Sequence, residues 1–324
     1  MRFLPLLLTC VAMPLAALAQ DIQQAGSSPA PLIWPGIAAD AAPEADAAPA
    51  PEPEAEEPPS DTQAFGAPAI WGGEGLEQCM VRPWIDAFGD CLASLGAGEE
   101  AVRFADALKA DEDIGMAGVM RAFFELGDVD VALVDFPGLA NSNRQVVFLN
   151  GKDPIMPAEA LQAAPPETRA VAAIRAAHPA AMSAGPRDYL TARLVPEGPQ
   201  RFVLLDRITD ACRACPILAT EVVFVDFDGG ELVGTSVGAW LPADLDMAAL
   251  GADVAAGDLT ALQTQLILRG YDVGGADGIN GPMTMAAQND FLVEHCLQGV
   301  AGEPLSAAAR AVLVDGAVGR CPSH

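Results

Sequence analysis

Residues 219–240 read ATEVVFVDFDGGELVGTSVGAW, two strand-like runs on either side of Asp228-Gly229-Gly230. β-Branched and aromatic residues dominate the first run, Ala219 to Phe227, and such residues suit a pleated, partly buried surface. The two adjacent glycines supply the positive φ angles that a tight two-residue turn needs. This stretch therefore predicts an antiparallel β-hairpin that ends near Trp240.

Further strand-like runs precede this hairpin. They span Val129 to Phe136, Val146 to Leu149, Tyr189 to Val195 and Phe202 to Ile208. Apolar residues spaced three and four apart instead predict helices from Trp84 to Leu95 and from Val102 to Leu108, and another is expected from about Pro166 to His178. Mixed element order with hairpin connections predicts one α+β domain with antiparallel strands over residues 64–241.

This region carries no recognisable pattern of catalytic or metal-binding residues. The whole chain has only three His, so a zinc site built from His is hard to assemble. No Gly-rich phosphate loop or nucleophile elbow is present. Glu74, Glu77 and Glu99 are candidates for a general acid, but no second carboxylate stands at an informative spacing, and acidic residues more often form a solvated face. We expect no catalytic residue, no metal and no cofactor. The lack of these patterns favours a protein that is not an enzyme.

The first 19 residues have the form of a secretory signal. Arg2 precedes an apolar run from Phe3 to Met13, and Ala17-Leu18-Ala19 is a small-x-small cleavage pattern. The run is shorter than the roughly 20 residues that a membrane-spanning helix needs. We expect residues 1–19 to be a cleaved signal peptide and the mature chain to be periplasmic, without a stable membrane span. The short signal and a Lys-poor composition favour a Gram-negative bacterium.

Residues 20–63 form a linker by composition. Between Pro29 and Pro59 stand nine Pro and seven acidic residues, with no Lys or Arg. Proline interrupts helices and sheets, like charges repel, and little apolar area exists to offset the entropy of ordering. We expect a disordered, acidic, Pro/Ala-rich tether without a specific partner.

The cysteines predict three disulfides. The chain has seven Cys, and Cys10 lies in the expected signal, which leaves 7 − 1 = 6 in an oxidising compartment. They fall into three pairs local in sequence, and we expect the bonds Cys79–Cys91, Cys212–Cys215 and Cys296–Cys321. A redox-active pair is the alternative reading of Cys212-Arg213-Ala214-Cys215. The flanking segments resemble antiparallel strands rather than the strand-to-helix entry of a thioredoxin, which favours a structural bond.

A different pattern occupies residues 258–324, after a linker expected at 242–257. Short amphipathic helices are predicted around Leu259 to Leu266, Met283 to Phe291 and Leu305 to Leu313. Helices this short are unstable alone, so they must share one small core. The sequence therefore predicts a small, all-α, three-helix bundle at the carboxyl end.

This bundle carries a recognisable motif. Its elements are Leu262-Gln263, Leu266, Gly270-Tyr271, Asp277-Gly278, Gly281-Pro282, Thr284, Ala287 and Phe291. In order and spacing they resemble the small three-helix peptidoglycan-binding domain that is appended to many cell-wall hydrolases. The sequence departs from the family pattern at Asn280, where an aromatic residue is usual, and at Leu292, where Gln is usual.

The resemblance implies non-catalytic attachment to the cell wall, in a shallow site beside the loop and the second helix of the bundle. The ligand-binding residues that it implies are Arg269, Tyr271, Asp277, Asn280, Thr284 and Asn289. These side chains offer hydrogen-bonding groups and one aromatic ring to amides, carboxylates and sugar hydroxyls.

The negative net charge of the chain limits the kinds of molecule that it is expected to bind. The chain has 44 acidic and 17 basic residues, a balance of −27, which argues against binding nucleic acid or an anionic membrane surface. We expect an exported, peptidoglycan-binding envelope protein that localises its α+β domain at the wall. One alternative is a cell-wall hydrolase or related enzyme with its catalytic site in residues 64–241. The other is a periplasmic partner-binding or inhibitor protein, because an acidic surface suits a basic envelope protein.

Overall fold

The structure is a computed structural model that describes residues 64–81, 86–139, 144–161, 163, 169–195, 198–298 and 305–315. The expected signal peptide at 1–19 and the expected linker at 20–63 lie outside the described residues. Within these ranges, helices combine with antiparallel sheets, which confirms the predicted mixture of α and β structure. No helix in the described ranges has both the length and the apolar character to cross a membrane.

Two four-stranded antiparallel sheets form the centre of the fold. The first sheet contains β1 (Val119–Phe124), β2 (Asp130–Asp135), β3 (Arg144–Leu149) and β4 (Ile155–Pro157). The second contains β5 (Ala181–Leu194), β6 (Gln200–Asp210), β7 (Ile217–Asp228) and β8 (Glu231–Pro242). In each sheet the spatial order of the strands equals their order in the chain, as short hairpin connections favour.

The hairpin predicted from residues 219–240 is present between β7 and β8. Asp228 pairs with Glu231 across the turn, and the two residues between them, Gly229 and Gly230, have φ angles of 52° and 77°. Both angles lie in the left-handed region, where glycine is not penalised, and such turns match the natural twist of paired strands.

Helices lie at both ends of the described chain. Before the first sheet come η1 (Ala67–Ala69), η2 (Leu76–Met80), α2 (Phe88–Ser94) and α3 (Glu99–Ala110). Between the sheets come η3 (Ala158–Ala160) and α4 (Arg169–Ala177), and after the second sheet come α5 (Met247–Ala256), α6 (Leu259–Leu268), α7 (Pro282–Glu294) and α8 (Ala307–Asp315).

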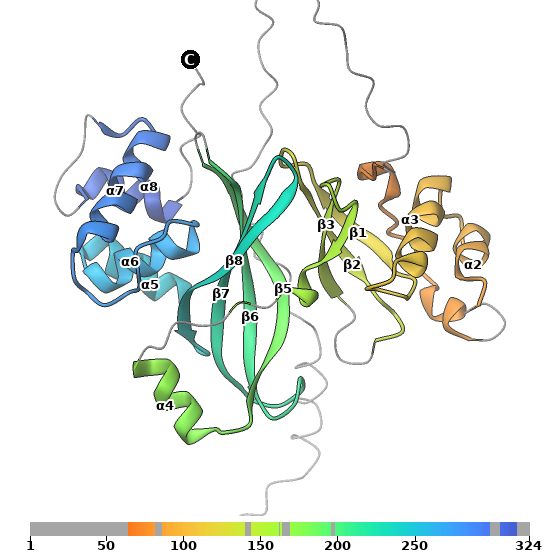
Figure 1. Ribbon diagram of the computed structural model, residues 1–324, viewed down its shortest axis with the longest axis horizontal. Helices are drawn as coiled ribbons and strands as arrows, with labels where there is room; N and C mark the ends of the chain where they lie inside the picture. The colour runs from red at the N-terminus through yellow and green to blue at the C-terminus, as the bar shows by residue number, and fades with distance from the viewer. Residues whose placement is uncertain are drawn as a thin grey trace, which may run out of the picture. The chain divides into compact units, whose positions relative to one another are not determined.

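These elements stack as helices, sheet, sheet and helices (Figure 1). On the outer side of the first sheet, Phe104 and Leu108 of α3 share a core with Ala132 and Val147. The central strands are therefore covered on both faces, and β2 is buried at all but its last residue. This double burial explains why the strands read as continuous apolar runs rather than as alternating ones.

The two sheets face each other. The ring of Phe148 in β3 lies edge-on to that of Phe202 in β6, with 4.9 Å between ring centres, and Phe227 of β7 contacts both rings. Gln200 also joins the sheets, because its side chain accepts a hydrogen bond from the N–H of Val129 and donates one to the carbonyl of the same residue. Apolar packing and satisfied polar contacts thus hold the sheets together.

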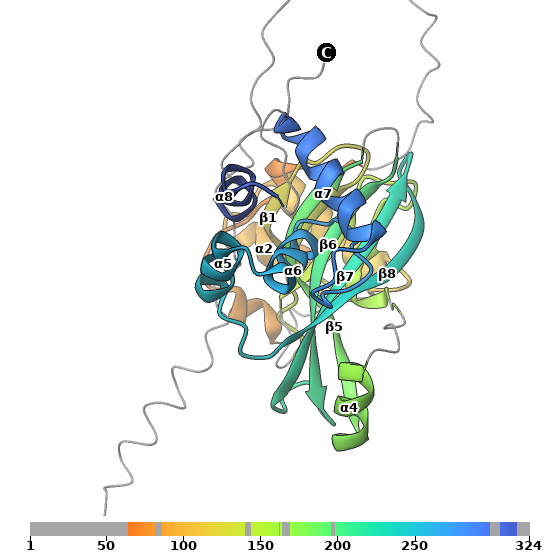
Figure 2. The same cartoon turned by 90° about the vertical axis from the view of Figure 1, so that its left-hand side faces the viewer.

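The opposite face of the second sheet packs against the C-terminal helices. Val203, Val222 and Phe224 share one core with Leu262 and with other apolar residues of α5–α8. Figure 2 looks onto this helical layer, with the strands behind it. Gly238 of β8 allows the close approach, because an added Cβ would lie 2.6 Å from the ring of Phe224. The helices and the sheet therefore form one packed unit.

The prediction of a linker at residues 242–257 is wrong, because this stretch contains helix α5. Leu250 and Val254, four residues apart, bury their side chains in the core of the C-terminal helices. The carboxylate of Asp246 caps the helix by accepting hydrogen bonds from the N–H groups of Ala248 and Ala249. An Ala-rich stretch with only two buried apolar positions gives a weak periodic pattern, and tertiary packing supplies the rest of the stability. The three helices expected within residues 258–324 are present as α6, α7 and α8, and α5 adds a fourth to this layer in the described residues.

Replacing Asp246 with Ala should lower the free energy of unfolding by about 1 kcal/mol, the usual cost of losing an N-cap. Urea denaturation followed by circular dichroism measures this difference. Asp244, an exposed acidic neighbour, gives the matched control, and we expect Asp244→Ala to leave stability unchanged. Equal stability of Asp246→Ala and the wild type would mean that the cap hydrogen bonds of Asp246 contribute nothing to the folded state.

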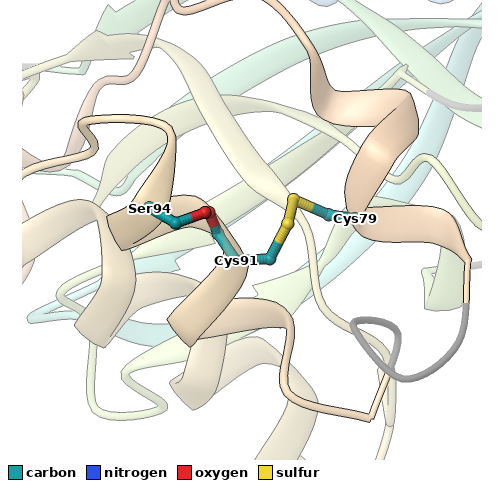
Figure 3. Close-up of a disulfide and its surroundings, with 3 residues drawn as sticks. All are labelled: Cys79, Cys91 and Ser94. Atoms are coloured by element: carbon teal, nitrogen blue, oxygen red, sulfur yellow. A yellow bond between two sulfur atoms is a disulfide. The ribbon is translucent and has the colours of Figure 1, made fainter.

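Two of the predicted disulfides are confirmed. Cys79 in η2 and Cys91 in α2 are bonded, with 5.6 Å between their Cα atoms, and Ser94 donates a hydrogen bond to the carbonyl of Cys91 (Figure 3). Cys212 and Cys215 are bonded in the connection between the antiparallel strands β6 and β7.

The third predicted disulfide is only partly within the described residues. Cys296 is disulfide-bonded, whereas Cys321 lies outside the described residues. The Cys296–Cys321 bond therefore stays a prediction.

Candidate functional site

Tyr271, an expected ligand residue, points into the interface between the helical layer and the second sheet. Its ring is buried, and its hydroxyl donates a hydrogen bond of 2.8 Å to Glu294 of α7. The guanidinium of Arg193, from β5, lies 4.1 Å from the centre of the ring and donates two hydrogen bonds to Glu294 Oε1. The ring and the hydroxyl of Tyr271 thus both contact other residues of the protein.

The side chain of Arg269 also makes its hydrogen bonds within the protein. Its guanidinium donates hydrogen bonds to the carbonyls of Leu313 and Val314, at 3.1 and 3.2 Å, and so joins the end of α6 to α8. Burial lowers the pKa of this guanidinium. The side chain therefore stabilises the packing of the helices and is not directed toward a ligand.

The loop between α6 and α7 is organised by Gln263. The amide nitrogen of this buried side chain lies 3.0, 3.1 and 3.0 Å from Asp277 Oδ1, the carbonyl of Ile279 and Thr284 Oγ1, which share its two N–H donors. Its carbonyl oxygen accepts from the N–H of Gly278 at 2.7 Å. The hydrogen bond from Gln263, together with one from the backbone of Ile279, lowers the pKa of Asp277. Asp277 and Thr284 therefore fix the shape of the loop.

The remaining two expected residues are Asn280 and Asn289. Asn280 is half-buried and accepts a hydrogen bond of 2.8 Å from Gln288, whereas Asn289 is exposed on α7. Of the six residues that the resemblance implies, Asp277 and Asn289 are thus exposed, Arg269 and Asn280 are half-buried, and Tyr271 and Thr284 are buried.

Two exposed apolar side chains flank Asn289 on α7. Met285 and Val293 stand four residues before and after it, and residues four apart lie on the same side of a helix. We name Met285, Asn289 and Val293 the α7 outer face, and its two apolar members are 41% and 45% exposed. Single exposed apolar residues are ordinary, but a local concentration of them is typical of an interaction surface.

A second feature lies on the second sheet, on the face that is turned to the first sheet. One row of cross-strand partners crosses the four strands: Pro186, Asp206, Glu221 and Trp240. Directly opposed residues on one face have Cβ atoms about 5 Å apart, so Asp206 and Glu221 place two carboxyl groups side by side. Both are almost fully buried, at 2% and 4% exposure.

The two acids line a cavity of about 280 Å³. Its walls are formed by Leu161, Ala163, Ser183, Pro186, Asp206, Glu221 and Val223. Ser183 Oγ donates a hydrogen bond of 2.5 Å to Asp206, and the indole N–H of Trp240 donates one of 2.6 Å to Glu221. In both views α4 lies at this end of the second sheet (Figures 1 and 2).

The environment of Glu221 changes its protonation. Burial raises the pKa of this carboxyl to about 7, because the charged form loses its hydration, and the neighbouring charge of Asp206 acts in the same direction. The hydrogen bond from Trp240 and the charge of Arg175 partly oppose this shift. Glu221 therefore titrates closer to neutral pH than an ordinary glutamate does.

Asp206 and Glu221 were not among the acids that the sequence suggested. The three candidates Glu74, Glu77 and Glu99 are all exposed, in agreement with a solvated face. Asp206 and Glu221 interrupt apolar strand runs, and that interruption was the available signal. Their juxtaposition depends on the strand register, which connects residues 15 positions apart through a specific pairing.

The described residues contain no group of three or more His, Cys, Asp or Glu that is placed to hold a metal ion. The geometry thus defines an α+β protein with an exposed, partly apolar helix face and a separate, acidic cavity in its second sheet. Comparison with protein-family models, with curated proteins and with solved structures finds no match to this chain.

Proposed function

We propose that this protein is an exported, non-catalytic, peptidoglycan-binding envelope protein that attaches to the wall through the α7 outer face. The single observation that supports this most is that the exposed apolar side chains of Met285 and Val293 stand one helical turn to either side of Asn289. This face lies on the helix that follows the Asp277-Gly278 loop, where the resemblance to peptidoglycan-binding domains places the ligand site. Apolar surface with interspersed amides suits the sugar faces and amide groups of the wall polymer.

The charge of this face suits a neutral or zwitterionic ligand. The two acidic residues of α7, Asp290 and Glu294, are both directed toward Arg193 of β5, at 3.6 and 2.5 Å. The α7 outer face itself has no charged member. Attachment through it should therefore depend little on salt, in contrast to binding of a basic envelope protein by the acidic surface of the chain.

The packing of the fold also bears on this proposal. Because α5–α8 share a core with the second sheet, a face on α7 is carried by the whole folded unit and not by a separate module. Binding to the wall would then hold both sheets near it and raise their local concentration there. For the same reason, point substitutions test the proposal better than truncations do.

Sedimentation with purified sacculi tests the proposal. We expect the full chain to pellet with sacculi at both low and high salt, and the double variant Met285→Ser, Val293→Ser to bind about tenfold more weakly, because it loses apolar contact area. Val233→Ser provides the control, since Val233 is an apolar residue on β8 that is even more exposed than Met285 and Val293. Equal pelleting of the double variant would overturn the assignment of the face, and release of soluble muropeptides would instead support a hydrolase.

A further inference from the structure

The disulfide in the connection between β6 and β7 differs from Cys79–Cys91 in its access to solvent. Cys212 is exposed and Cys215 is half-buried, whereas Cys79 and Cys91 are 0% and 2% exposed. We propose that Cys212–Cys215 is a redox-active disulfide that accepts two electrons from the dithiol of a partner protein. This inference does not rest on attachment to the wall, because none of these cysteines lies on α7.

Access decides which of the two bonds exchanges in the folded protein. In thiol–disulfide exchange a thiolate attacks one sulfur of the bond, so a buried bond reacts only after the protein opens. Cys79 and Cys91 pack in one core with Trp71 and Phe88, out of reach of an external thiol. Cys212 is open to attack without any unfolding, and exposed disulfides are commonly the labile, regulatory or catalytic ones.

The bond is not needed to close the loop that it spans. The N–H of Asp210 donates to the carbonyl of Pro216 at 3.2 Å, just outside the two cysteines, and the N–H of Cys215 donates to the carbonyl of Cys212 at 3.0 Å. A bond between residues three positions apart also removes fewer conformations from the unfolded chain than the bond between η2 and α2, whose partners are 12 apart. The antiparallel strands that favoured a structural bond by sequence thus close the loop themselves.

Contacts with neighbouring elements hold the loop in place in both redox states. The N–H of Ala211 donates to the carbonyl of Ala180, just before β5, at 3.1 Å, and Arg213, between the cysteines, forms an ion pair with Glu159 of η3. Neither contact involves a sulfur atom. The two thiols therefore stay close to each other after reduction, and an oxidant can form the same bond again.

The exchange takes place in two steps. A thiolate of the partner attacks Sγ of Cys212, a mixed disulfide forms, and the bond to Cys215 breaks with its sulfur leaving as a thiolate. The second thiolate of the partner then attacks the partner's own sulfur in the mixed disulfide and releases Cys212. The partner's dithiol is thereby oxidised to a disulfide, this chain is reduced to two thiols, and the two protons of the partner's thiols pass through solvent to Cys212 and Cys215.

Reduced thioredoxin serves as the protein dithiol in the test. It is mixed with the full, oxidised chain at neutral pH, free thiols are alkylated at intervals, and mass spectrometry of peptides reports each cysteine separately. We expect Cys212 and Cys215 to be reduced together, at least about 100-fold faster than Cys79 and Cys91, whose bond is the internal control. Oxidised glutathione, added after thioredoxin is removed, should restore the Cys212–Cys215 bond. The proposal is overturned if the two bonds react at equal rates or if Cys212–Cys215 stays oxidised in the folded chain.

A trapping experiment tests the order of attack. A thioredoxin variant that lacks its second cysteine cannot complete the exchange, so the mixed disulfide accumulates. We expect this thioredoxin to be attached to Cys212, the more exposed of the two residues. Attachment to Cys215 alone would contradict the proposed path, because access would then not select the sulfur that is attacked.

Paired variants separate a redox-active bond from a structural one. We expect Cys212→Ser, Cys215→Ser to lower the Tm by less than about 3 °C and Cys79→Ser, Cys91→Ser to lower it by about 5 °C or more. A larger loss for the first variant than for the second would show that Cys212–Cys215 is structural and would overturn the proposal. The rate comparison uses the wild-type chain and decides the matter even if a variant does not fold.

Discussion

Glu294→Ala is expected to lower the free energy of unfolding by about 3–5 kcal/mol, the cost of breaking a buried ion pair from one side. Glu294 accepts hydrogen bonds from Arg193 and from the hydroxyl of Tyr271, and the Arg193 and Glu294 side chains are only 8% and 11% exposed. Burial lowers the pKa of Arg193, but the hydrogen bond and the charge of Glu294 outweigh it, so the net pKa is raised. Removing Glu294 leaves this guanidinium with the weaker, exposed partner Asp290.

Urea denaturation of the full chain measures this effect. Asp290→Ala is the matched control, because Asp290 is an exposed partner of the same guanidinium at 3.6 Å, and we expect it to cost less than about 1 kcal/mol. The double variant Arg193→Met, Glu294→Ala should recover part of the loss, since no buried charge then stays uncompensated. A loss below about 1 kcal/mol for Glu294→Ala would show that this contact does not join the helices to the sheet.

Stability should fall by about 3 kcal/mol as the pH rises from 4.5 to 7, through the contribution of Glu221 alone. Its pKa is raised from 4.5 to about 7 in the folded protein, and each pKa unit corresponds to about 1.4 kcal/mol. The folded state binds the proton more tightly than the unfolded state, so this contribution is fully present below pH 4.5 and is lost as the pH rises through about 7.

Glu221→Gln isolates this contribution. The variant imitates the protonated acid and keeps an acceptor for the indole of Trp240, so at pH 8 we expect it to be more stable than the wild type by up to about 3 kcal/mol. At pH 4 the two proteins should be nearly equal. Thermal and urea unfolding across this pH range, with Asp228→Asn as the control for an exposed acid, provide the measurement. A variant that is less stable than the wild type at pH 8 would contradict the pKa assigned to Glu221.

These substitutions also separate effects at the α7 outer face from effects at the acidic cavity. Glu294 faces the second sheet from α7, while Val293, its neighbour in sequence, belongs to the α7 outer face. Loss of wall binding in Met285→Ser, Val293→Ser with unchanged stability would therefore concern the surface alone. The Glu221 measurements concern the cavity alone, because this residue lies on the other face of the second sheet.

Local features were predictable from the amino-acid sequence. The turn at Asp228-Gly229-Gly230 needs only two glycines that tolerate positive φ, and the bonds Cys79–Cys91 and Cys212–Cys215 join residues 12 and 3 positions apart. The long apolar strands were recognisable because their residues favour a buried, extended chain. In each case the decisive contacts are made within one segment or between adjacent segments.

Other features were decided by tertiary structure. Helix α5 depends on a core that it shares with α6–α8, and Tyr271 is buried because Arg193, 78 positions earlier in the chain, covers its ring. The residues around Tyr271 give no indication that strand β5, which carries Arg193, will pack against this ring. Asp206 and Glu221 likewise become neighbours only through the register of β6 and β7. Contacts between distant segments depend on how whole layers pack, and the periodicity of a single segment carries no information about its partner.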